Sequence, residues 1–446
     1  MISQKVEFNV HFIGIGGVSM RGLAEYFKSV GFSVSGSDRE FSLALERLAQ
    51  KGIKTYVGHS ESNLKNVHVV VYSDAIDDSN VELKKARELG LYVLSRGEAL
   101  RSVVENFSDV VGVAGCHGKT TTTCMLAHIC KCAKLEFTAH IGGEDLSLGN
   151  CVIDGSKVFL SEVCEFKKNI NKFNADYAVC LNVGKDHMDC YDSEEELKLA
   201  YLNFAKRAYK SIINQKDEYL ASQKLANSIG FSVEDSSDVF AEDVKSIGGK
   251  YCFSLHRGDE YKCKIELSVY GRHNVENALA AATCALALGI DVKHIKKGLK
   301  NFKGVVRRFE EIGEINEGVV VADYAHHPDE ILACMKTAKE VCKGKLFVVF
   351  QPHTYSRTIY LKEEFIRTLS QIENLSLFKT FSARENYKKG GSAYDLHRQI
   401  DSSCYFEDVN SMIACYKNSM SKNDMLLILG AGDLYYKVKE KLNLNK

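Results

Sequence analysis

Apolar runs alternate with amphipathic segments along the first hundred residues of the chain. Short runs rich in Val, Ile and Phe have the length of buried strands, and the segments between them repeat their apolar residues at helical spacing. The predicted strands are Val10–Ile15, Phe32–Ser35, Val67–Tyr72 and Leu91–Leu94. The predicted helices are Met20–Val30, Leu43–Lys51, Val81–Leu89 and Glu98–Glu105. Strands that alternate with helices pair in parallel, so we expect a Rossmann-like α/β domain.

The same alternation continues toward the C-terminus, with one interruption. The middle of the chain predicts strands near Phe159–Val163 and Ala178–Val183, a helix at Glu194–Arg207 and an antiparallel patch between Lys250 and Val269. Further strands are predicted at Val319–Ala322, Leu346–Phe350, Leu375–Phe381 and Met425–Leu429. The fold class is therefore predicted to be α/β, in three domains of about 150 residues each. Their expected boundaries are 1–107, 108–304 and 305–446.

The stretch from Asp109 to Ile129 carries the most specific chemical signal. It reads as a buried strand, a turn of small residues and an apolar helix, DVVGVAGCHGKTTTTCMLAHI. Backbone N–H groups in such a turn and the helix N-terminus bind phosphate, in contrast to a turn that merely caps a helix. We expect Lys119 to reach the β- and γ-phosphates of ATP and the Thr120 hydroxyl to bind Mg²⁺. The residues of this predicted ATP-binding loop are Gly115, Cys116, His117, Gly118, Lys119, Thr120 and Thr121.

A second glycine-rich turn follows the first predicted strand. Gly14-x-Gly16-x-x-Ser19, with an extra glycine at Gly17, approximates the dinucleotide-binding fingerprint. Asp38 stands about 22 residues beyond Gly16, where an acid can hold ribose hydroxyls. Taken alone, this pattern fits a tight strand–helix connection equally well. Two nucleotide-type loops in one chain nevertheless indicate two different phosphate-bearing ligands.

Acidic residues and a histidine follow two strands of the middle segment. Glu162 ends the strand in FLSEVCEF, Glu165 lies three residues further on, and Asp186, His187 and Asp189 follow the next strand in LNVGKDHMD. Carboxylates and an imidazole at neighbouring strand ends can hold a cation that bridges ATP phosphates. Without a phosphate loop on an adjacent strand, the plainer interpretation would be solvated loop residues.

Two asparagines open a later apolar helix. GRHNVENALAA places His273, Asn274 and Asn277 at its start. Asn274 and Asn277 are three residues apart and share a helix face. We expect them to meet a base or ribose as well as to cap the helix.

Composition narrows the setting in which this chemistry takes place. Lys plus Arg and Asp plus Glu both number 58, so the formal net charge is zero and favours neither nucleic acid nor an anionic membrane as a partner. The N-terminus carries no signal-peptide pattern, and the longest apolar helix, Asn277–Ile290, is too short to span a bilayer. The 15 cysteines are odd in number and irregularly spaced. They indicate thiols in a reducing cytoplasm rather than a disulfide framework.

The motifs together resemble the Mur ligase family. They occur in the family's order and cover the chain from about residue 8 to 433 as GIGG, GCHGKTTTT, the glutamate of SEVCE, NVGKDHMD, GRHNVENALAA, RRFE, DYAHHPDEI and FQPHTYSRT. The HFIGIGG opening and DYAHHP favour the alanine-adding branch. The resemblance implies a UDP-sugar-binding N-terminal domain, an ATP-binding central domain and an amino-acid-binding C-terminal domain.

The resemblance also implies an activity in peptidoglycan precursor synthesis. ATP would phosphorylate the lactyl carboxylate of UDP-N-acetylmuramate, and the L-alanine amine would attack the acyl phosphate to give an amide. Lys119, Glu162, His187, Arg308 and Asp323 are the implied catalytic residues, with Arg307 an alternative to Arg308 for neutralising the transferred charge. The implied Mg²⁺ ligands are Thr120, Glu162 and His187.

Binding roles are implied by the same resemblance. His273, Asn274, Asn277 and Arg308 would bind ATP together with the phosphate loop. Gly16, Gly17, Asp38, Ser73 and His117 would lie along the UDP-sugar. Tyr324, His326, His353 and Arg357 would form the amino-acid pocket, with Arg357 on the alanine carboxylate. His327 and Pro328 fit a turn-forming role equally well.

Three positions depart from the family pattern. Gly184 replaces a usual acid, Cys116 a usual threonine or small residue, and Thr354 an arginine of some relatives. Three other functions remain open at this point: a ligase that reattaches recycled peptides to UDP-N-acetylmuramate, a nicotinamide-dependent oxidoreductase that uses GIGG and Asp38, and a non-catalytic UDP-sugar sensor. The last two leave GKTTTT, Lys119 and Glu162 without a role.

Overall fold

The apolar runs near the N-terminus form a five-stranded parallel sheet in the order β3-β2-β1-β4-β5. The computed structural model describes residues 8–184, 190–233, 237–383 and 385–443. The strands of this sheet are β1 (Asn9–Ile13), β2 (Ser33–Asp38), β3 (Lys54–Val57), β4 (Val69–Tyr72) and β5 (Tyr92–Ser95). The segments between them are α1 (Val18–Ser29), α2 (Leu43–Gln50), the short 3₁₀ helix η1 (Glu61–Leu64), α3 (Val81–Glu88) and α4 (Arg96–Val104).

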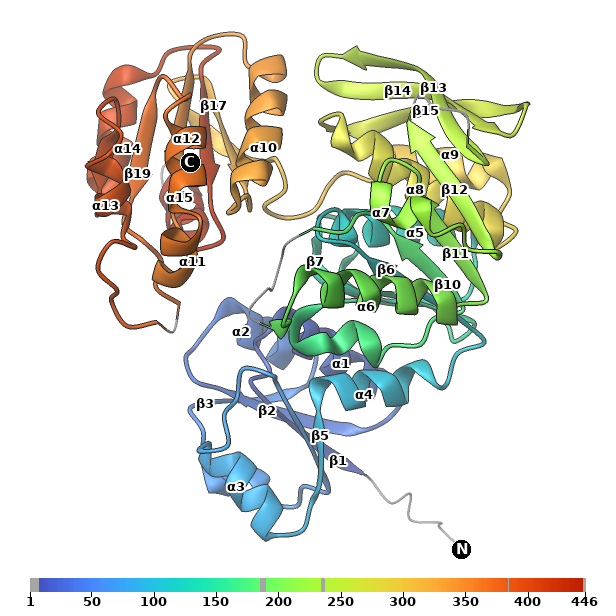
Figure 1. Cartoon of the computed structure of the whole chain (residues 1–446). Coiled ribbons are helices and arrows are strands. Elements are labelled where there is room, and N and C mark those ends of the chain that lie inside the picture. The colour runs from blue at the N-terminus through green and yellow to red at the C-terminus, as the bar shows by residue number, and fades with distance from the viewer. Residues whose placement is uncertain (1–7, 185–189, 234–236, 384, 444–446) are drawn as a thin grey trace, which may run out of the picture. The chain divides into compact units, whose positions relative to one another are not determined.

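Both faces of this first sheet are buried. Val10 and Phe12 of β1 pack into the core that includes residues of α1 and α4, whereas Ile13 packs into a second core with Leu83 and Ala86 of α3. Figure 1 shows α3 on the opposite side of the sheet from α1 and α4. The near-continuous apolar strands of the sequence are explained by this two-sided burial. The predicted parallel α/β sheet is confirmed, although the half-exposed β3 was not predicted.

The central sheet has ten strands in the order β15-β14-β13-β12-β11-β10-β6-β9-β7-β8. Its strands are β6 (Asp109–Ala114), β7 (Phe137–Asp145), β8 (Gly149–Ile153), β9 (Val158–Glu162), β10 (Tyr177–Cys180), β11 (Lys210–Asn214), β12 (Ser228–Val233), β13 (Val239–Ile247), β14 (Lys250–Arg257) and β15 (Glu260–Tyr270). Its helices are α5 (Lys119–Ala133), the 3₁₀ segment η2 (Phe166–Asn171), α6 (Glu194–Arg207), α7 (Glu218–Ser222), α8 (His273–Ala287) and α9 (Val292–Asn301). The predicted patch at Lys250–Val269 corresponds to the adjacent strands β14 and β15.

Helix α5 packs closely against α9. An added Cβ at Gly298 of α9 would lie 2.5 Å from the Cα of Ile129 in α5, so only glycine permits the two helices to approach this far. Met125, Leu126 and Ile129 are among the buried apolar residues of α5. The helix that follows the glycine turn after β6 is therefore tightly packed against α9.

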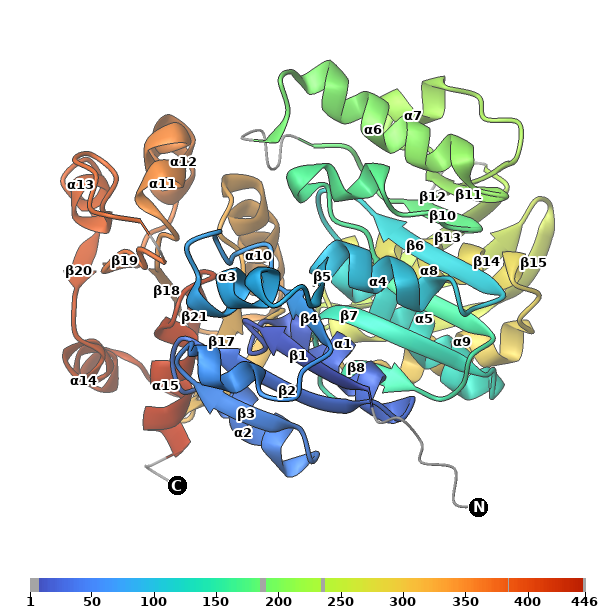
Figure 2. The ribbon, with the colours of Figure 1, turned by 90° about the horizontal axis from the view of Figure 1, so that it is seen from below.

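The C-terminal sheet has six strands in the order β16-β17-β21-β18-β19-β20, with β16 antiparallel at one edge. Its strands are β16 (Glu310–Ile315), β17 (Gly318–Asp323), β18 (Leu346–Phe350), β19 (Leu375–Phe378), β20 (Cys404–Phe406) and β21 (Met425–Leu429). Its helices are α10 (Pro328–Val341), α11 (Tyr355–Tyr360), α12 (Lys362–Leu369), α13 (Ala393–His397), α14 (Val409–Ser419) and α15 (Leu434–Asn443). In Figure 2, α12 and α13 cover one face of the sheet, and α14 and α15 cover the other.

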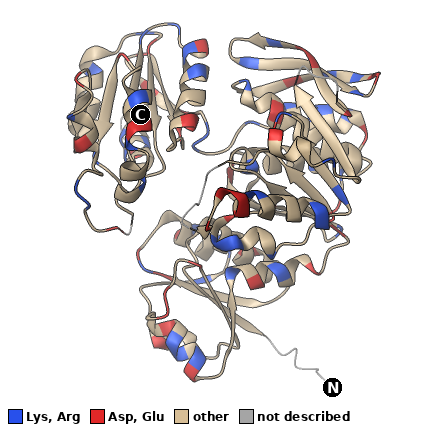
Figure 3. Ribbon diagram, in the orientation of Figure 1, with Lys and Arg blue, Asp and Glu red and all other residues tan. Residues whose placement is uncertain are grey.

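Chain packing divides the molecule into two compact units. The first comprises Met1–Val244, Phe253–Glu266 and Glu276–Lys303, and the second Lys245–Cys252, Leu267–Val275 and Gly304–Lys446. Lys and Arg are interspersed with Asp and Glu on the helices of both units, as on α3 (Figure 3). No helix in the described part of the chain is long and apolar enough to cross a membrane. All 15 cysteines are free thiols.

A buried histidine of the central sheet holds the helix that follows the first glycine turn. His140 of β7 donates a hydrogen bond to the carbonyl oxygen of Ser19 in α1 at 2.9 Å, and Ser19 Oγ lies 3.2 Å away. Gly22 makes this contact feasible, because a Cβ there would lie 2.9 Å from the His140 ring. Burial lowers the pKa of His140 to about 4, so the ring is neutral in the folded protein.

This neutral histidine predicts a pH dependence of stability. The unfolded chain takes up a proton on His140 below pH 6.5 whereas the folded chain does so only near pH 4, so the His140 contribution is present above 6.5 and is lost as the pH falls toward 4. Between pH 6.5 and 4, the free energy of unfolding measured with urea should fall by about 1–3 kcal/mol less for His140→Asn than for wild type. His68→Asn, at an exposed histidine, is the matched control. Equal pH slopes for wild type and His140→Asn would contradict the assignment.

Candidate active site

The phosphate loop predicted from the sequence connects β6 to α5. Gly118 is the N-cap residue of α5 and has a left-handed backbone, with φ +87°. A side chain at this position would be strained and would also run into the Asn277 side-chain oxygen. Glycine at 118 thus lets the chain turn sharply from the strand into the helix, which leaves the first N–H groups of α5 at the end of the loop.

An asparagine that the sequence did not single out braces this loop. Asn182 follows β10; its Oδ1 accepts a hydrogen bond from the His117 backbone N–H at 2.9 Å, and its Nδ2 donates to the His117 carbonyl at 3.1 Å. Its backbone carbonyl also accepts from Cys116 N–H at 3.2 Å. One residue at a neighbouring strand end therefore fixes both the backbone N–H and the backbone carbonyl of His117. Its place beside the LNVGKDHMD motif is the only sequence signal for this role.

Lys119 is paired with Glu165, which the sequence pattern groups with the cation-binding carboxylates and not with the phosphate loop. Its ammonium lies 3.2 Å from both carboxylate oxygens of Glu165 and also contacts the carbonyls of Gly115 and Cys116. Burial alone would lower the pKa of Lys119, but the negative charge of Glu165 outweighs it and raises the pKa. Lys119 is therefore a fixed positive charge at the loop.

The predicted metal ligands Thr120 and Glu162 lie together. The Thr120 hydroxyl donates to a Glu162 carboxylate oxygen at 2.9 Å, and the other oxygen accepts from the Gly142 backbone N–H at 2.6 Å. The remaining predicted ligand, His187, lies outside the described residues, as do Asp186 and Asp189. Within the described ranges, no three His, Cys, Asp or Glu residues cluster as a metal site would require.

The asparagines of the later motif have distinct surroundings. Asn277 accepts a hydrogen bond from the Thr122 hydroxyl at 3.4 Å and so lies against the start of α5. Asn274 Nδ2 donates to the Tyr270 carbonyl at 2.7 Å. His273 is exposed at the start of α8, but the protein around its ring disfavours the charged form and, with Arg308, lowers its pKa to about 4. Both asparagines lie in α8, as predicted, and Asn277 directly borders the phosphate loop.

The first glycine turn is held by the end of β2. The carbonyl of Ser37 accepts from Gly14 and Ile15 N–H at 2.8 and 3.0 Å, and the Asp38 carboxylate accepts from Gly16 N–H at 2.8 Å. Ser73 lies on the other side, 3.1 Å from where a Cβ of Gly14 would be. The predicted UDP-sugar residues Gly16, Gly17, Asp38 and Ser73 are thus brought to one turn.

A buried carboxylate supports this turn from the opposite side of β2. The Ser37 hydroxyl donates to Glu82 at 2.5 Å, and His59 Nδ1 lies 2.9 Å from the same carboxylate. Burial raises the pKa of Glu82, but hydrogen bonds from His11, Ser37 and Asn63 prevail and lower it to about 2. Glu82 is therefore charged in the fold and ties β2 to α3.

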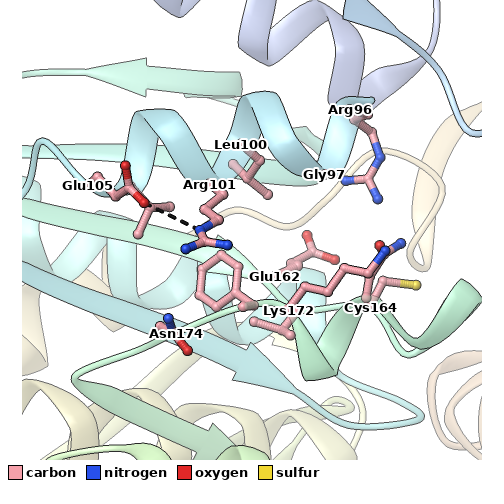
Figure 4. A pocket seen from close by; sticks show the side chains of 13 residues that line it. Arg96, Gly97, Leu100, Arg101, Glu105, Glu162, Cys164, Lys172 and Asn174 are labelled. Carbon is pink, nitrogen blue, oxygen red and sulfur yellow. Dashed lines mark hydrogen bonds and ion pairs between the residues drawn. The ribbon is translucent and has the colours of Figure 1, made fainter. Parts of the chain in front are cut away.

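A cavity of about 90 Å³ lies between α4 and the segment after β9 (Figure 4). Arg96 and Cys164 lie at one end of it, and Arg101 with Glu105 at the other. Glu162 also lines it, as does Asn169, whose Nδ2 has no hydrogen-bond partner among the described residues. The cavity therefore combines apolar walls with three cationic side chains, of Arg96, Arg101 and Lys172, and two carboxylates, of Glu105 and the predicted metal ligand Glu162.

Arg96 connects this cavity to the first glycine turn. Its guanidinium pairs with Asp74 at 3.0 Å and donates to the Ser19 hydroxyl at 3.4 Å. Lys167, two residues beyond Glu165, donates to the Asp74 carbonyl at 2.7 Å. The residue after Ser73 is thus tied both to α4 and to the segment that follows the predicted metal ligand.

In the second unit, the two arginines of RRF have different environments. Arg307 is buried and donates to the carbonyls of Gly430 and Gly432 at 2.7 and 2.9 Å. The side chain of Arg308 is 38% exposed, 3.8 Å from Glu330 and stacked near Tyr324. The structure gives Arg307 a structural role and leaves Arg308 the better placed of the two for a ligand.

Asp323 ends β17 and is locked to the backbone. Its two oxygens accept from the N–H groups of Phe309 and Ala325, both at 2.8 Å. Burial raises the pKa of Asp323 despite the opposing influence of Arg308. These bonds tie the RRF segment to the DYAHHP segment.

Four predicted pocket residues come together beside these segments. The rings of His326 and His353 are 6.1 Å apart, Tyr324 and His326 are 5.3 Å apart, and an Arg357 nitrogen lies 3.4 Å from His353 Nδ1. Burial lowers the pKa of His326, and burial with Arg357 lowers that of His353 to about 4. Arg357 therefore supplies the positive charge of a cluster whose histidines are neutral at pH 7.

Neighbouring residues of the same motifs have backbone roles. His327 accepts from Asp329 N–H at 3.4 Å as the N-cap of α10, and Pro328 is the first residue of that helix. The turn-forming interpretation of this pair is therefore supported. Thr354, one of the departures from the family pattern, is the N-cap of α11 and has φ +67°, a strained conformation for a β-branched residue.

The other two departures touch one another. A Cβ on Gly184 would lie 3.0 Å from both Cβ and Sγ of Cys116. The thiol therefore fills the space where a side chain at 184 would begin. Glycine at 184 and cysteine at 116 are a matched pair in this chain.

Comparisons with known proteins agree with this arrangement. Family models match residues 9–108 as the Mur ligase family catalytic domain, 113–285 as the Mur ligase middle domain and 307–432 as the Mur ligase glutamate ligase domain. The chain belongs to the Mur ligase family. Its members use ATP, and the phosphate loop described above lies in the segment matched by the middle domain.

Individual relatives match this Mur ligase over nearly its whole length. A protein from Clostridium novyi named UDP-N-acetylmuramate–L-alanine ligase is 39% identical over 440 residues, which covers 96% of this chain and 95% of that protein. A crystal structure of UDP-N-acetylmuramate–alanine ligase from Thermotoga maritima matches with TM-score 0.85 at 27% identity, covering 99% of this chain and 100% of that one. A murein peptide ligase from Psychrobacter arcticus, 22% identical, shares the fold with TM-score 0.72 and 98% coverage of both chains.

The brace on the phosphate loop of this Mur ligase can be tested with Asn182→Ala. Loss of the two side-chain bonds to His117 should loosen the loop and raise the KM for ATP by roughly tenfold, with little change in the thermal midpoint. Steady-state kinetics at saturating concentrations of the other substrates measures this. Asn106→Ala, which also removes two hydrogen bonds of an asparagine side chain to the backbone, is the control. An unchanged KM for ATP would show that the loop holds its shape without Asn182.

Proposed function

We propose that this chain is a UDP-N-acetylmuramate–L-alanine ligase of peptidoglycan precursor synthesis. It joins L-alanine to the lactyl carboxylate of UDP-N-acetylmuramate and converts ATP to ADP and phosphate. The observation that carries the proposal is the 39% identity, over 96% of this chain, to a protein of that name. The phosphate loop with Lys119, Thr120 and Glu162 in place supports an active enzyme.

The chemistry requires ATP because a carboxylate is a poor electrophile at neutral pH. Transfer of the γ-phosphoryl group to the lactyl oxygen gives an acyl phosphate, and phosphate then leaves as the amine of alanine attacks the carbonyl carbon. Negative charge develops on the transferred group, so fixed positive charge and N–H donors close to it accelerate the reaction. Lys119, with its raised pKa, and the first N–H groups of α5 supply this stabilisation.

Thr120 and Glu162 fit a magnesium site. Their oxygens are 2.9 Å apart at the N-terminus of α5, and oxygen donors are what Mg²⁺ prefers. When bound, Mg²⁺ neutralises phosphate charge. Glu162 is oriented for this by the Gly142 N–H. We assign the third ligand position to His187, and nucleotide contacts to His273, Asn274, Asn277 and Arg308.

The UDP-sugar is assigned to the first glycine turn. Gly16 and Gly17 supply backbone N–H groups for the diphosphate, Asp38 and Ser73 flank them, and His117 of the phosphate loop completes the set. Glu162 lines the cavity, as does Arg96, which donates a hydrogen bond to Ser19 beyond this turn. We assign the muramyl end of the substrate to this cavity, since the lactyl carboxylate has to reach Glu162 and Lys119.

The amino acid is assigned to Tyr324, His326, His353 and Arg357. Arg357 pairs with the alanine carboxylate, and the neutral histidines let the amine approach without an added positive charge. Asp323 positions the adjoining backbone. The corresponding domain boundaries are 1–107 for the UDP-sugar, 108–304 for ATP and 305–446 for the amino acid. The free thiols support a reducing, cytoplasmic location.

The second candidate is the ligase that attaches a recycled tripeptide, supported by the fold match to a murein peptide ligase. Phosphate release by the full chain with Mg-ATP and UDP-N-acetylmuramate separates the two. We expect the highest kcat/KM with L-alanine, lower values with glycine and L-serine, and none with L-Ala-γ-D-Glu-diaminopimelate. Lys119→Ala should lower turnover by roughly 10² or more while UDP-N-acetylmuramate binding changes little.

Two results of this assay would reject the proposal. A preference for the tripeptide would assign the chain to recycling. Near-normal turnover of Lys119→Ala would show that the assignment of the ATP site to the phosphate loop is wrong. A change in nicotinamide absorbance with the UDP-sugar would support the oxidoreductase instead.

A further inference from the structure

In this structure Lys119 is paired with a carboxylate that competes with the ATP phosphates for its ammonium. Its ammonium lies 3.2 Å from both oxygens of Glu165. Under the function proposed above, the same ammonium has to approach the β- and γ-phosphates. A lysine turned toward phosphate loses at least part of its contact with Glu165, so nucleotide binding has a consequence for the carboxylate that is left.

Loss of the Lys119 ammonium would leave the Glu165 carboxylate without a countercharge in a buried position. Its side chain is 1% exposed, so water cannot replace the ammonium. An unpaired carboxylate buried to this degree strongly disfavours the state that contains it. Tyr191 does not offer an immediate replacement, because its hydroxyl already donates to the Glu165 backbone carbonyl at 2.8 Å.

A second buried tyrosine, Tyr201, belongs to the same core. Tyr201 of α6 is fully buried, and its hydroxyl has no hydrogen-bond partner among the described residues. Helix α6 packs against η2, the segment that begins directly after Glu165, and Tyr201 belongs to the same apolar core as Tyr191. Burial raises the pKa of Tyr201, and Glu165 is the charged group that raises it most. An orphaned buried hydroxyl is uncommon in a native core and calls for an explanation.

We propose that the Tyr201 hydroxyl is the donor that Glu165 accepts when Lys119 turns to the nucleotide. The ammonium then moves from carboxylate to phosphate, and the phenol takes up the carboxylate by a change of hydrogen bond with no proton transferred. Glu165 holds Lys119 until nucleotide binds, and Tyr201 makes the release of the lysine less unfavourable. Both are positioning residues that act on ATP through Lys119.

The exchange explains why the Tyr201 hydroxyl has no partner among the described residues. A phenol already bonded to Glu165 would compete with Lys119, whereas an unpaired one is available only after the lysine moves. It also predicts that Tyr201 and Glu165 are coupled, because the hydroxyl has no task once the carboxylate charge is removed.

Tyr201→Phe tests the exchange, since it deletes only the hydroxyl. The thermal midpoint without ligand should stay equal or rise, because an unsatisfied polar group is removed. The Kd for a non-hydrolysable ATP analogue with Mg²⁺, measured by calorimetry, should rise by roughly tenfold. The Kd for UDP-N-acetylmuramate should not change. Thr123→Val, which removes another orphaned buried hydroxyl from α5, is the matched control and should bind the analogue as wild type does.

A second background ties the effect to Glu165. In Glu165→Gln no buried charge is stranded when Lys119 moves, so adding Tyr201→Phe should weaken analogue binding no further. An equal loss in both backgrounds would overturn the link between the two residues. A lower midpoint of Tyr201→Phe without ligand, or an unchanged Kd, would overturn the proposal itself. Failure of the wild type to bind the analogue would instead refute the proposed function.

Discussion

A left-handed glycine at the start of α5 sets the geometry on which the active site depends. Gly118 turns the chain from β6 into the helix at φ +87°, with the Asn277 side chain directly against it. Residues with a Cβ are strained in this conformation and would collide there. The directions of Lys119 and Thr120 follow from this turn. Asn182 then fixes the loop from one neighbouring strand end, and Glu165 fixes Lys119 from the other.

Local sequence patterns predict the parts of the fold that carry strong periodic signals. The apolar β1 and β21 and the phosphate loop with α5 were predicted close to their observed bounds. The half-exposed β3 and the β7–β8 hairpin were not, because pairing with neighbours rather than their own residues stabilises them. The same limit applies to Gly298, whose need for glycine comes from α5, far away in sequence.

The site shows the same division between local and long-range information. The contact of Thr120 with Glu162 follows from motif and strand order, and the structure contains it. The roles of Asn182 and Glu165 depend on contacts across the sheet that spacing does not reveal. Arg307 and Arg308 are chemically identical neighbours, so only burial separates the one bonded to backbone carbonyls from the one facing solvent. The contact between Cys116 and Gly184 likewise explains two departures that looked unrelated in the sequence.

Replacement of Gly118 by alanine tests the central role of the loop most directly. Calorimetric titration of Gly118→Ala with a non-hydrolysable ATP analogue and Mg²⁺ should give an affinity at least about tenfold below that of wild type. The affinity for UDP-N-acetylmuramate should be unchanged. Gly90→Ala, at another left-handed glycine with open space around it, should bind both ligands normally. Wild-type nucleotide affinity in folded Gly118→Ala would contradict the account.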